Sequence, residues 1–189
     1  MNLFVLAVGV KAAAQAHGDK HVVKMLLEAC QMLYTAHWTA VYPEIIGKRP
    51  KALATPQSMV SAPLRSDGGI GYRPAHINHP CTKWIRASLG NYEWAAKLAL
   101  ALVDEYEFRW PGRIHSCKVH AEWLATNQPF LPRLPRIDFA VAMDDIFKVG
   151  SNAIASYRNY YRKSKASKGL TVYTKRLPPS WLGLNNFQL

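Results

Sequence analysis

The chain has 189 residues, of which 49% are hydrophobic and 19% charged, and this composition excludes an intrinsically disordered protein. Its 24 lysines and arginines against 12 acidic residues give a net charge of +12, which favours a polyanionic partner, nucleic acid ahead of an anionic membrane surface. The 3 cysteines lack CxxC spacing, which argues against a disulfide framework or a zinc cluster and for a reducing cytoplasm.

The first ten residues, MNLFVLAVGV, are apolar, but they lack a basic start and are too short to cross a bilayer. We expect a buried strand or extended segment here, and no membrane partner. The alanine-rich residues 11–17 favour a helix and lead into a longer helix predicted at roughly 19–39. Asp19 stands where the start of a helix favours a capping carboxylate.

One face of the 19–39 helix carries titratable groups of three kinds. His21, Lys24 and Glu28 recur at i, i+3 and i+7, so an imidazole, an ammonium group and a carboxylate lie within about two turns. A largely apolar stretch, residues 29–33, follows at once. Two interpretations stay open: a catalytic site, or a solvated face beside the core.

Residues 43–80 are rich in proline and glycine, which break long helices. Between positions 46 and 90 the chain carries seven lysines and arginines but a single acid, Asp67. A loop this long inside a compact domain is usually either functional or disordered. We expect a long basic loop at 43–80 that becomes ordered on a phosphate backbone.

The longest helical pattern runs over 80–109, and the string NHPCTKW stands at its start. The N-terminus of a helix offers free N–H groups and the positive end of the helix dipole, so it suits a phosphate. Asn78 and His79 either bind a phosphate there or cap the helix. Lys83 and Arg86 lie farther along the helix, where we expect Arg86 to reach the same anion.

A shorter helix is predicted at about 115–125, and three prolines between 129 and 135 predict a loop after it. His115 and His120 lie five positions apart and have no partnering carboxylate pattern. We therefore expect no metal at this pair, and no cofactor elsewhere in the chain.

The C-terminal part of the chain is strongly basic, because residues 151–176 contain seven lysines and arginines and no acid. A last basic helix is predicted at 151–167, with Ser151 as its cap. Residues 173–189 form an irregular tail packed on the body. Together the elements predict a mainly α fold, a single compact helical domain (1–189) with little sheet and a long basic Pro/Gly-rich loop.

Tyrosines alternate with arginines in the predicted last helix. Aromatic rings stack on bases while guanidinium groups meet phosphates, so this mixture suits a nucleic acid with unpaired or flipped bases. In the competing interpretation Tyr157 and Tyr161, four positions apart, belong to the core. We expect both, with one edge of the helix buried and the edge that carries Arg158, Arg162 and Lys165 in water.

Asp19, His21 and Glu28 also carry a family resemblance. In the pyrimidine-dimer DNA glycosylases of the phage endonuclease V type, an Asp-x-His run opens a helix and a catalytic glutamate follows the histidine by seven residues. The chain resembles that family at these positions, and it is similar to a group of phage proteins that share the strings DKHVVKM, NHPCTKW and YTKR. The resemblance implies a small, basic, mostly helical enzyme without a metal, located in the cytoplasm of the host cell.

In that family the α-amino group of the chain attacks the sugar C1′, and the glutamate stabilises the intermediate or shuttles protons. An α-amine has a pKa of about 8, so part of it is neutral and nucleophilic near pH 7. This sequence departs from the family pattern at that point. Asn2 is bulky, which predicts that Met1 is retained, and the segment before Asp19 is longer. The resemblance therefore carries over the acidic site but not an amine at Met1.

The sequence thus predicts an enzyme that acts on a flipped, damaged or modified pyrimidine base in double-stranded DNA, in the manner of an N-glycosylase or lyase. Two alternatives stay open: a transferase that hypermodifies a thymine-derived base in phage DNA, and a non-catalytic basic nucleic-acid-binding protein. The predicted catalytic residues are Glu28, His21 and Asp19. The predicted nucleic-acid contacts are Lys24, Asn78, His79, Lys83, Arg86, Arg158, Arg162, Lys163, Lys175 and Arg176, with Tyr161 and Trp181 as base-stacking residues.

Overall fold

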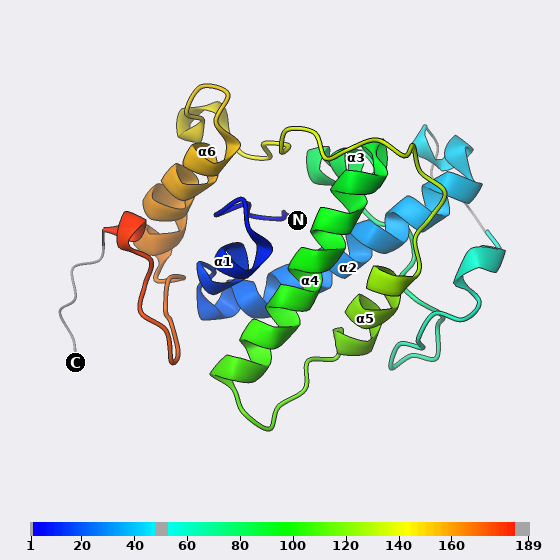
Figure 1. The fold of residues 1–189 in the computed structure, drawn as a ribbon, viewed down its shortest axis with the longest axis horizontal. Coiled ribbons are helices and arrows are strands. Elements are labelled where there is room, and N and C mark those ends of the chain that lie inside the picture. Colours follow the sequence, from blue (N-terminus) through cyan, green and yellow to red (C-terminus); the bar gives the residue numbers. More distant parts are fainter. Residues whose placement is uncertain (1, 48–52, 184–189) are drawn as a thin grey trace.

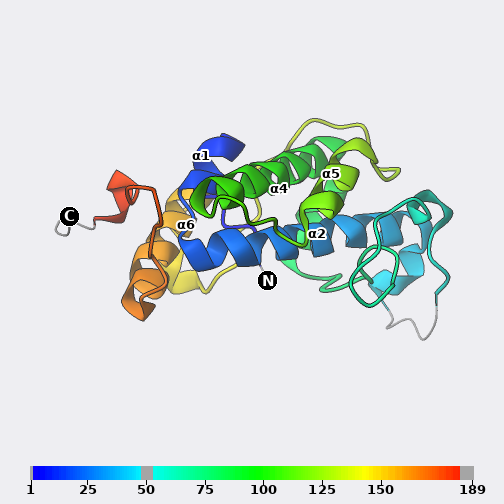
Figure 2. The ribbon, with the colours of Figure 1, turned by 90° about the horizontal axis from the view of Figure 1, so that it is seen from below.

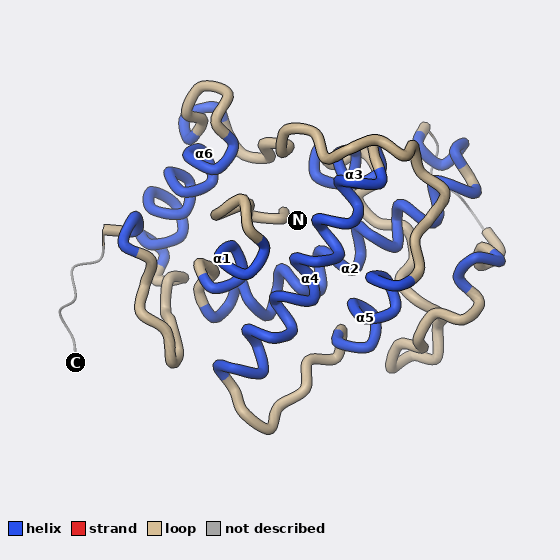
Figure 3. Tube along the Cα trace, viewed as in Figure 1, coloured by secondary structure: helices blue, strands red, loops and turns tan. Residues whose placement is uncertain are grey.

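The computed structural model describes residues 2–47 and 53–183, and in these ranges the chain is mainly helical (Figures 1 and 3). Its α-helices are α1 (Val10–Gln15), α2 (Asp19–Val41), α3 (Pro80–Ala87), α4 (Leu89–Arg109), α5 (Lys118–Thr126) and α6 (Ala153–Tyr160). The described residues form no strand, only an isolated antiparallel bridge between Leu64 and Ile70. The predicted mainly α class with little sheet is confirmed. No helix in the described ranges has the length and apolar character needed to span a bilayer.

Two long helices, α2 and α4, form the centre of the molecule, and α1, α3 and α5 pack against α4 (Figures 1 and 2). Their contact buries apolar side chains that recur at helical spacing, such as Leu26 and Leu33 of α2 and Leu98 and Leu102 of α4, all fully buried. Each fully buried leucine contributes about 2 kcal/mol to folding. The α2–α4 pair is therefore the rigid support on which the other segments rest.

The single helix predicted over 80–109 is wrong, because the chain breaks at Ser88 into α3 and α4. Ser88 has extended backbone (φ −155°, ψ 156°), and its Oγ accepts the N–H of Asn91 at 3.1 Å, which caps α4. The segment between α5 and α6 crosses this break, and its Leu134 carbonyl accepts the N–H of Gly90. A Cβ at Gly90 would lie 2.3 Å from the nitrogen of Arg136, so only glycine fits this crossing.

The last predicted helix, 151–167, is only partly α-helical. The α-helix α6 ends at Tyr160, and a π-helical turn over Tyr161–Lys165 and a 3₁₀ turn over Ala166–Lys168 continue it. Its cap is Asn152, whose Oδ1 accepts the N–H of Ala155 at 2.9 Å, and not Ser151. Residues 173–183 of the predicted tail form no α-helix or strand and contain a 3₁₀ turn at Ser180–Leu182; residues 184–189 lie outside the described ranges.

The N-terminal segment, residues 2–6, is buried, as the apolar start of the chain predicts, and it forms neither helix nor strand. The expected extended backbone is interrupted at Phe4, whose φ is 39°. Its side chains from Leu3 to Leu6 are at most 4% exposed. Hydrogen bonds to distant elements hold the segment at both ends: Nδ2 of the Asn2 side chain donates to the carbonyl of Ala142 at 2.7 Å, and Arg158 Nε donates to the carbonyl of Leu6 at 2.9 Å. The segment is thus an internal part of the core, placed between α6 and the α2–α4 pair (Figure 1).

The long loop between α2 and α3 lies at one end of the molecule, while α6 and the tail lie at the other (Figures 1 and 2). It packs on the C-terminal half of α2, where Trp38 Nε1 donates to the carbonyl of Tyr72 at 3.0 Å and Thr35 exchanges hydrogen bonds with Ala75. Short 3₁₀ turns at Pro43–Ile46 and Gln57–Met59 interrupt it. Three of the basic residues expected in this loop, Lys48, Arg49 and Lys51, lie outside the described residues.

Candidate active site

Glu28 points into the protein. Its side chain is on the face of α2 that the N-terminal segment covers, and the residue is only 7% exposed. Oε2 accepts the backbone N–H of Asn2 at 2.5 Å, and Oε1 lies 3.7 Å from Nζ of the exposed Lys24. A buried carboxylate is costly without donors, and these two groups provide hydrogen bonding and compensating charge. The sequence interpretation of this face as a solvated surface is therefore excluded at Glu28.

The NHPCTKW string lies beside Glu28 because Asn2 joins the two motifs. Sγ of Cys81, in the first turn of α3, lies 3.6 Å from Oδ1 of Asn2 and 3.7 Å from the hydroxyl of Tyr157 in α6. Burial raises the pKa of the Cys81 thiol, so the group is neutral at physiological pH. The elements α2, α3 and α6 thus converge on Asn2, with Glu28 as the carboxylate of the cluster.

His21 lies about two turns before Glu28, buried under the N-terminal segment. Its Nδ1 is 2.6 Å from the hydroxyl of Tyr161, which also accepts the N–H of Gly18 at 2.8 Å. The ring of Phe4 meets the imidazole edge-on at 5.0 Å. Burial, followed by the charge on His17, lowers the pKa of His21 to about 3. His21 is therefore neutral at physiological pH and does not serve as an imidazolium acid.

Asp19 belongs to a different network from Glu28, nine residues and about 13 Å farther along the helix axis. Its Oδ1 accepts from Arg109 at 2.8 Å, and its Oδ2 accepts from the hydroxyl of Thr174 at 2.8 Å. The backbone N–H of Asp19 in turn donates to the carbonyl of Val172. Asp19 therefore fastens the C-terminal tail to α2 and α4, and the structure does not bring it to the predicted catalytic position.

Several predicted DNA contacts have structural partners. Asn78 donates to the carbonyl of Ile46 at 3.0 Å, and Arg86 donates to that of Ile77. His79 is the cap of α3, since its Nδ1 accepts the N–H of Cys81 at 3.2 Å. Of the two interpretations that the sequence left open, the structure shows the capping role for His79.

Four lysines among the predicted DNA contacts are exposed to solvent. Lys24, Lys83 and Lys163 are exposed at the surface of the described chain, as is Lys175. Tyr161, by contrast, is fully buried, so the structure offers no face of its ring to a base. The base-stacking role expected for Tyr161 is thus replaced by a core position, in which its hydroxyl connects Gly18 and His21.

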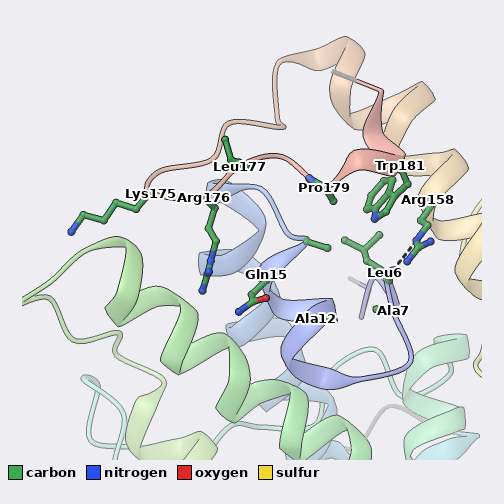
Figure 4. A pocket seen from close by; sticks show the side chains of 11 residues that line it. Leu6, Ala7, Ala12, Gln15, Arg158, Lys175, Arg176, Leu177, Pro179 and Trp181 are labelled. Atoms are coloured by element: carbon green, nitrogen blue, oxygen red, sulfur yellow. Dashed lines mark hydrogen bonds between the residues drawn. The ribbon is translucent and has the colours of Figure 1, made fainter. Parts of the chain in front are cut away.

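Four of the predicted contacts meet in one hollow at the C-terminal end of the molecule. Arg158, Lys175, Arg176 and Trp181 line a cavity of about 550 Å³ together with Leu6 and Gln15 (Figure 4). We call it the C-terminal groove. The sequence placed the four residues in one basic region, but it gave no sign that the N-terminal residues form the opposite wall.

A second buried polar cluster lies beneath the long loop. The hydroxyl of Tyr72 is 3.3 Å from Sγ of Cys117, which precedes α5, and Sγ of Cys30 points to the carbonyl of Cys117 at 4.0 Å. Cys30 is fully buried in the core. Among the described residues no group of three or more histidine, cysteine or acidic side chains is arranged to hold a metal ion.

Two residues of the Glu28 site were not predicted from the sequence. Asn2 was read only as a bulky second residue, and Cys81 only as part of a helix start. Both meet Glu28 or its partner through contacts between distant parts of the chain, for which a single sequence carries no signal. Comparisons with protein-family models, with curated proteins and with solved structures found no match to this chain.

Proposed function

We propose that the protein is a DNA N-glycosylase-like enzyme that releases a damaged or modified pyrimidine base after the base has been extruded from the duplex. The observation that carries this proposal is the buried Glu28 carboxylate, held against the N-terminal segment by the Asn2 N–H at 2.5 Å in a chain of net charge +12. Acidic side chains with fixed orientation and restricted water are typical of catalytic positions.

The chemistry of the reaction requires one carboxylate that stabilises charge and transfers a proton. Cleavage of an N-glycosidic bond develops positive charge on the sugar, which a nearby anion stabilises, as carboxylates do in glycoside hydrolysis. Glu28 takes a proton from the attacking water as oxygen bonds to C1′. The bond from C1′ to the base nitrogen breaks, and its electron pair leaves with the base. Glu28 then returns the proton to the released base.

The neighbours of Glu28 support this assignment of roles. His21 is neutral and engaged with Tyr161, so it orients the N-terminal segment instead of transferring the proton. Asp19 is held by Arg109. Glu28 is therefore the carboxylate of the predicted trio that keeps a position suited to chemistry, while His21 and Asp19 are positioning residues.

The positive charge of the chain supports DNA as the substrate. Phosphate contacts by lysine and arginine supply most of the affinity of a DNA-binding protein, and they offset the few kcal/mol that extrusion of a base costs. Damaged or mispaired bases are the least costly to extrude, which favours a lesion or a modified base over a normal pyrimidine.

The test uses duplexes that contain a pyrimidine dimer, 5-hydroxymethyluracil or an abasic site, with released bases measured by mass spectrometry and covalent adducts trapped by borohydride. We expect base release by the wild type, a loss of at least about 100-fold in Glu28→Gln, and no change in the matched surface variant Glu122→Gln. A trapped adduct identifies an amine nucleophile, and hence a lyase. A base of increased mass without release identifies the transferase, and binding without any chemistry identifies a non-catalytic protein; both of these outcomes overturn the proposal.

A further inference from the structure

Two further hollows lie beside the C-terminal groove shown in Figure 4. A neighbouring hollow of about 530 Å³ shares Arg158 and Trp181 with it, and another of about 460 Å³ shares Gln15 and Arg176. The C-terminal groove shares lining residues with each of the other two hollows, so the three lie in a row, which we call the trough. The N-terminal residues and α1 line one side of it, and α6, the tail and α4 line the other.

The trough is positively charged. Its basic residues are Lys11, Lys97, Arg158, Arg162, Lys175 and Arg176, and its acids are Asp104 and Glu105. Glu105 is only 3% exposed and accepts hydrogen bonds from both Arg109 and Arg176, so Arg176 is paired with it. The other five basic residues of the trough stand against Asp104. The remaining excess of cations is suited to an anionic chain that follows the trough.

An aromatic ring stands at the junction of two hollows. The indole of Trp181 lines both, and the guanidinium of Arg158 lies 5.2 Å from its centroid. The walls beside it are apolar, with Leu6, Leu177 and Pro179. A flat ring with apolar neighbours inside a basic channel is the arrangement by which proteins stack unpaired bases while they hold the backbone.

Hydrogen bonds to backbone carbonyls fix two arginine side chains of the trough. Arg158 donates one N–H to the carbonyl of Leu6 at 2.9 Å, and Arg162 donates one to that of Trp181 at 3.3 Å. A guanidinium has five N–H groups, so these contacts fix each side chain without using its capacity for a phosphate. Lys175 sits in left-handed backbone (φ 57°), which lysine rarely adopts, and its side chain extends outward at the margin of the groove (Figure 4).

We propose that the trough binds unpaired nucleotides of a single DNA strand, with a base stacked at Trp181 and phosphates on Arg158, Arg162 and Lys175. The trough is a site separate from Glu28, and its binding of a single strand does not depend on chemistry at Glu28. Leu6 of the trough is at most about 14 Å from Asn2 of the Glu28 site along the N-terminal segment. Where Glu28 acts on an extruded base, as proposed above, the trough takes the nucleotides that flank that base.

The stacking part of the inference is tested by the fluorescence anisotropy of labelled (dT)₁₅ and of an abasic oligomer of equal length. Trp181→Ala weakens binding of (dT)₁₅ about tenfold or more and leaves the abasic oligomer unchanged, whereas Trp181→Phe retains most of the affinity. Retained affinity for (dT)₁₅ in Trp181→Ala, or an equal loss for both oligomers, overturns the stacking role. The thermal melting of each variant shows whether it is folded, and Trp181→Phe keeps the test valid if the alanine variant is not.

The phosphate part is tested by salt titration. Lys175→Gln and Arg162→Gln each reduce the slope of log K against log salt by about 0.7 for a single strand. Arg133→Gln, an exposed arginine on the segment before α6, is the matched control and leaves the slope unchanged. An equal reduction in the control overturns the inference. Glu28→Gln retains full (dT)₁₅ binding, so failure of the trough and failure of the glycosylase chemistry are distinguished.

Discussion

The backbone nitrogen of Asn2 lies 2.5 Å from Oε2 of Glu28, although 26 positions separate the two residues in the chain. This hydrogen bond places the beginning of the described chain inside the candidate active site. The geometry of the carboxylate therefore depends on the N-terminal segment as much as on α2.

The Asn2–Glu28 contact is testable through the backbone itself. Asn2→Pro removes the N–H donor, whereas Asn2→Ala keeps it and removes only the side-chain contacts. We expect the proline variant to be less stable than the alanine variant by about 2 kcal/mol, the value of a hydrogen bond to a charged group. Urea unfolding of both variants measures the difference, and equal midpoints would show that the N–H contributes nothing.

Three buried histidines predict how stability depends on pH. Burial lowers the pKa of His17 to about 4, of His21 to about 3 and of His37 to about 4. In the unfolded chain each of these histidines titrates at about pH 6.5. Below that pH the unfolded state therefore binds protons that the folded state does not bind. Stability therefore falls as the pH drops from 6.5 towards 4, and for the fully buried His17 alone the loss approaches about 1.4 kcal/mol per unit.

Urea midpoints at pH 7.5, 6.5 and 5.5 check this dependence. We expect a smaller decrease between the first two values than between the second and the third, because at pH 6.5 only about half of the unfolded imidazoles are protonated. His17→Gln removes one titrating group, so its midpoint should decrease less over the same interval. A profile that is flat down to pH 5 would mean that these imidazoles are not held neutral by burial.

Asp19 should prove structural. Its ion pair with the fully buried Arg109 is mostly shielded from solvent, and breaking such a pair costs about 3 kcal/mol. Asp19→Asn should lower stability by that amount and expose the tail near Thr174 to limited proteolysis, but the folded variant should still release base. The matched change Asp67→Asn, in an exposed pair with Arg65 that solvent screens, should leave stability nearly unchanged. Loss of activity in folded Asp19→Asn would restore Asp19 to the catalytic set.

Position 90 requires glycine because the segment between α5 and α6 crosses over the start of α4 at this point. Gly90→Ala should destabilise the protein by about 2 kcal/mol or more, since the new Cβ meets backbone atoms of Arg136 and Pro135. Gly9→Ala is the control, because nothing lies within 4 Å of its Cβ position. Thermal unfolding distinguishes the two variants. Similar melting temperatures would show that the segment between α5 and α6 does not pack against Gly90.

The elements that the sequence predicted well are those set by local pattern. The periodicity of α2 and the burial of the chain's apolar start follow from short-range patterns of apolar residues, and both are confirmed. The break at Ser88 had a local signal as well, a serine whose Oγ can accept the N–H of the residue three positions later, Asn91, but the apolar period continues across it and concealed the boundary.

The candidate site itself was only half predictable. Glu28 could be singled out because helical spacing places it with His21 on one face. Its partner Asn2, the ion pair of Asp19 with Arg109 and the wall that Leu6 contributes to the C-terminal groove all join distant parts of the chain. Such contacts are decided by packing, and no local pattern in a single sequence specifies them.

The central claim is that the Glu28 carboxylate carries the chemistry, and the single-turnover rate of base release tests it most directly. With protein in excess over a lesion-containing duplex, Glu28→Gln, shown to be folded by its melting curve, should be slower than the wild type by about 100-fold or more. Glu122→Gln should match the wild type. A Glu28→Gln rate within threefold of the wild-type rate would contradict the account.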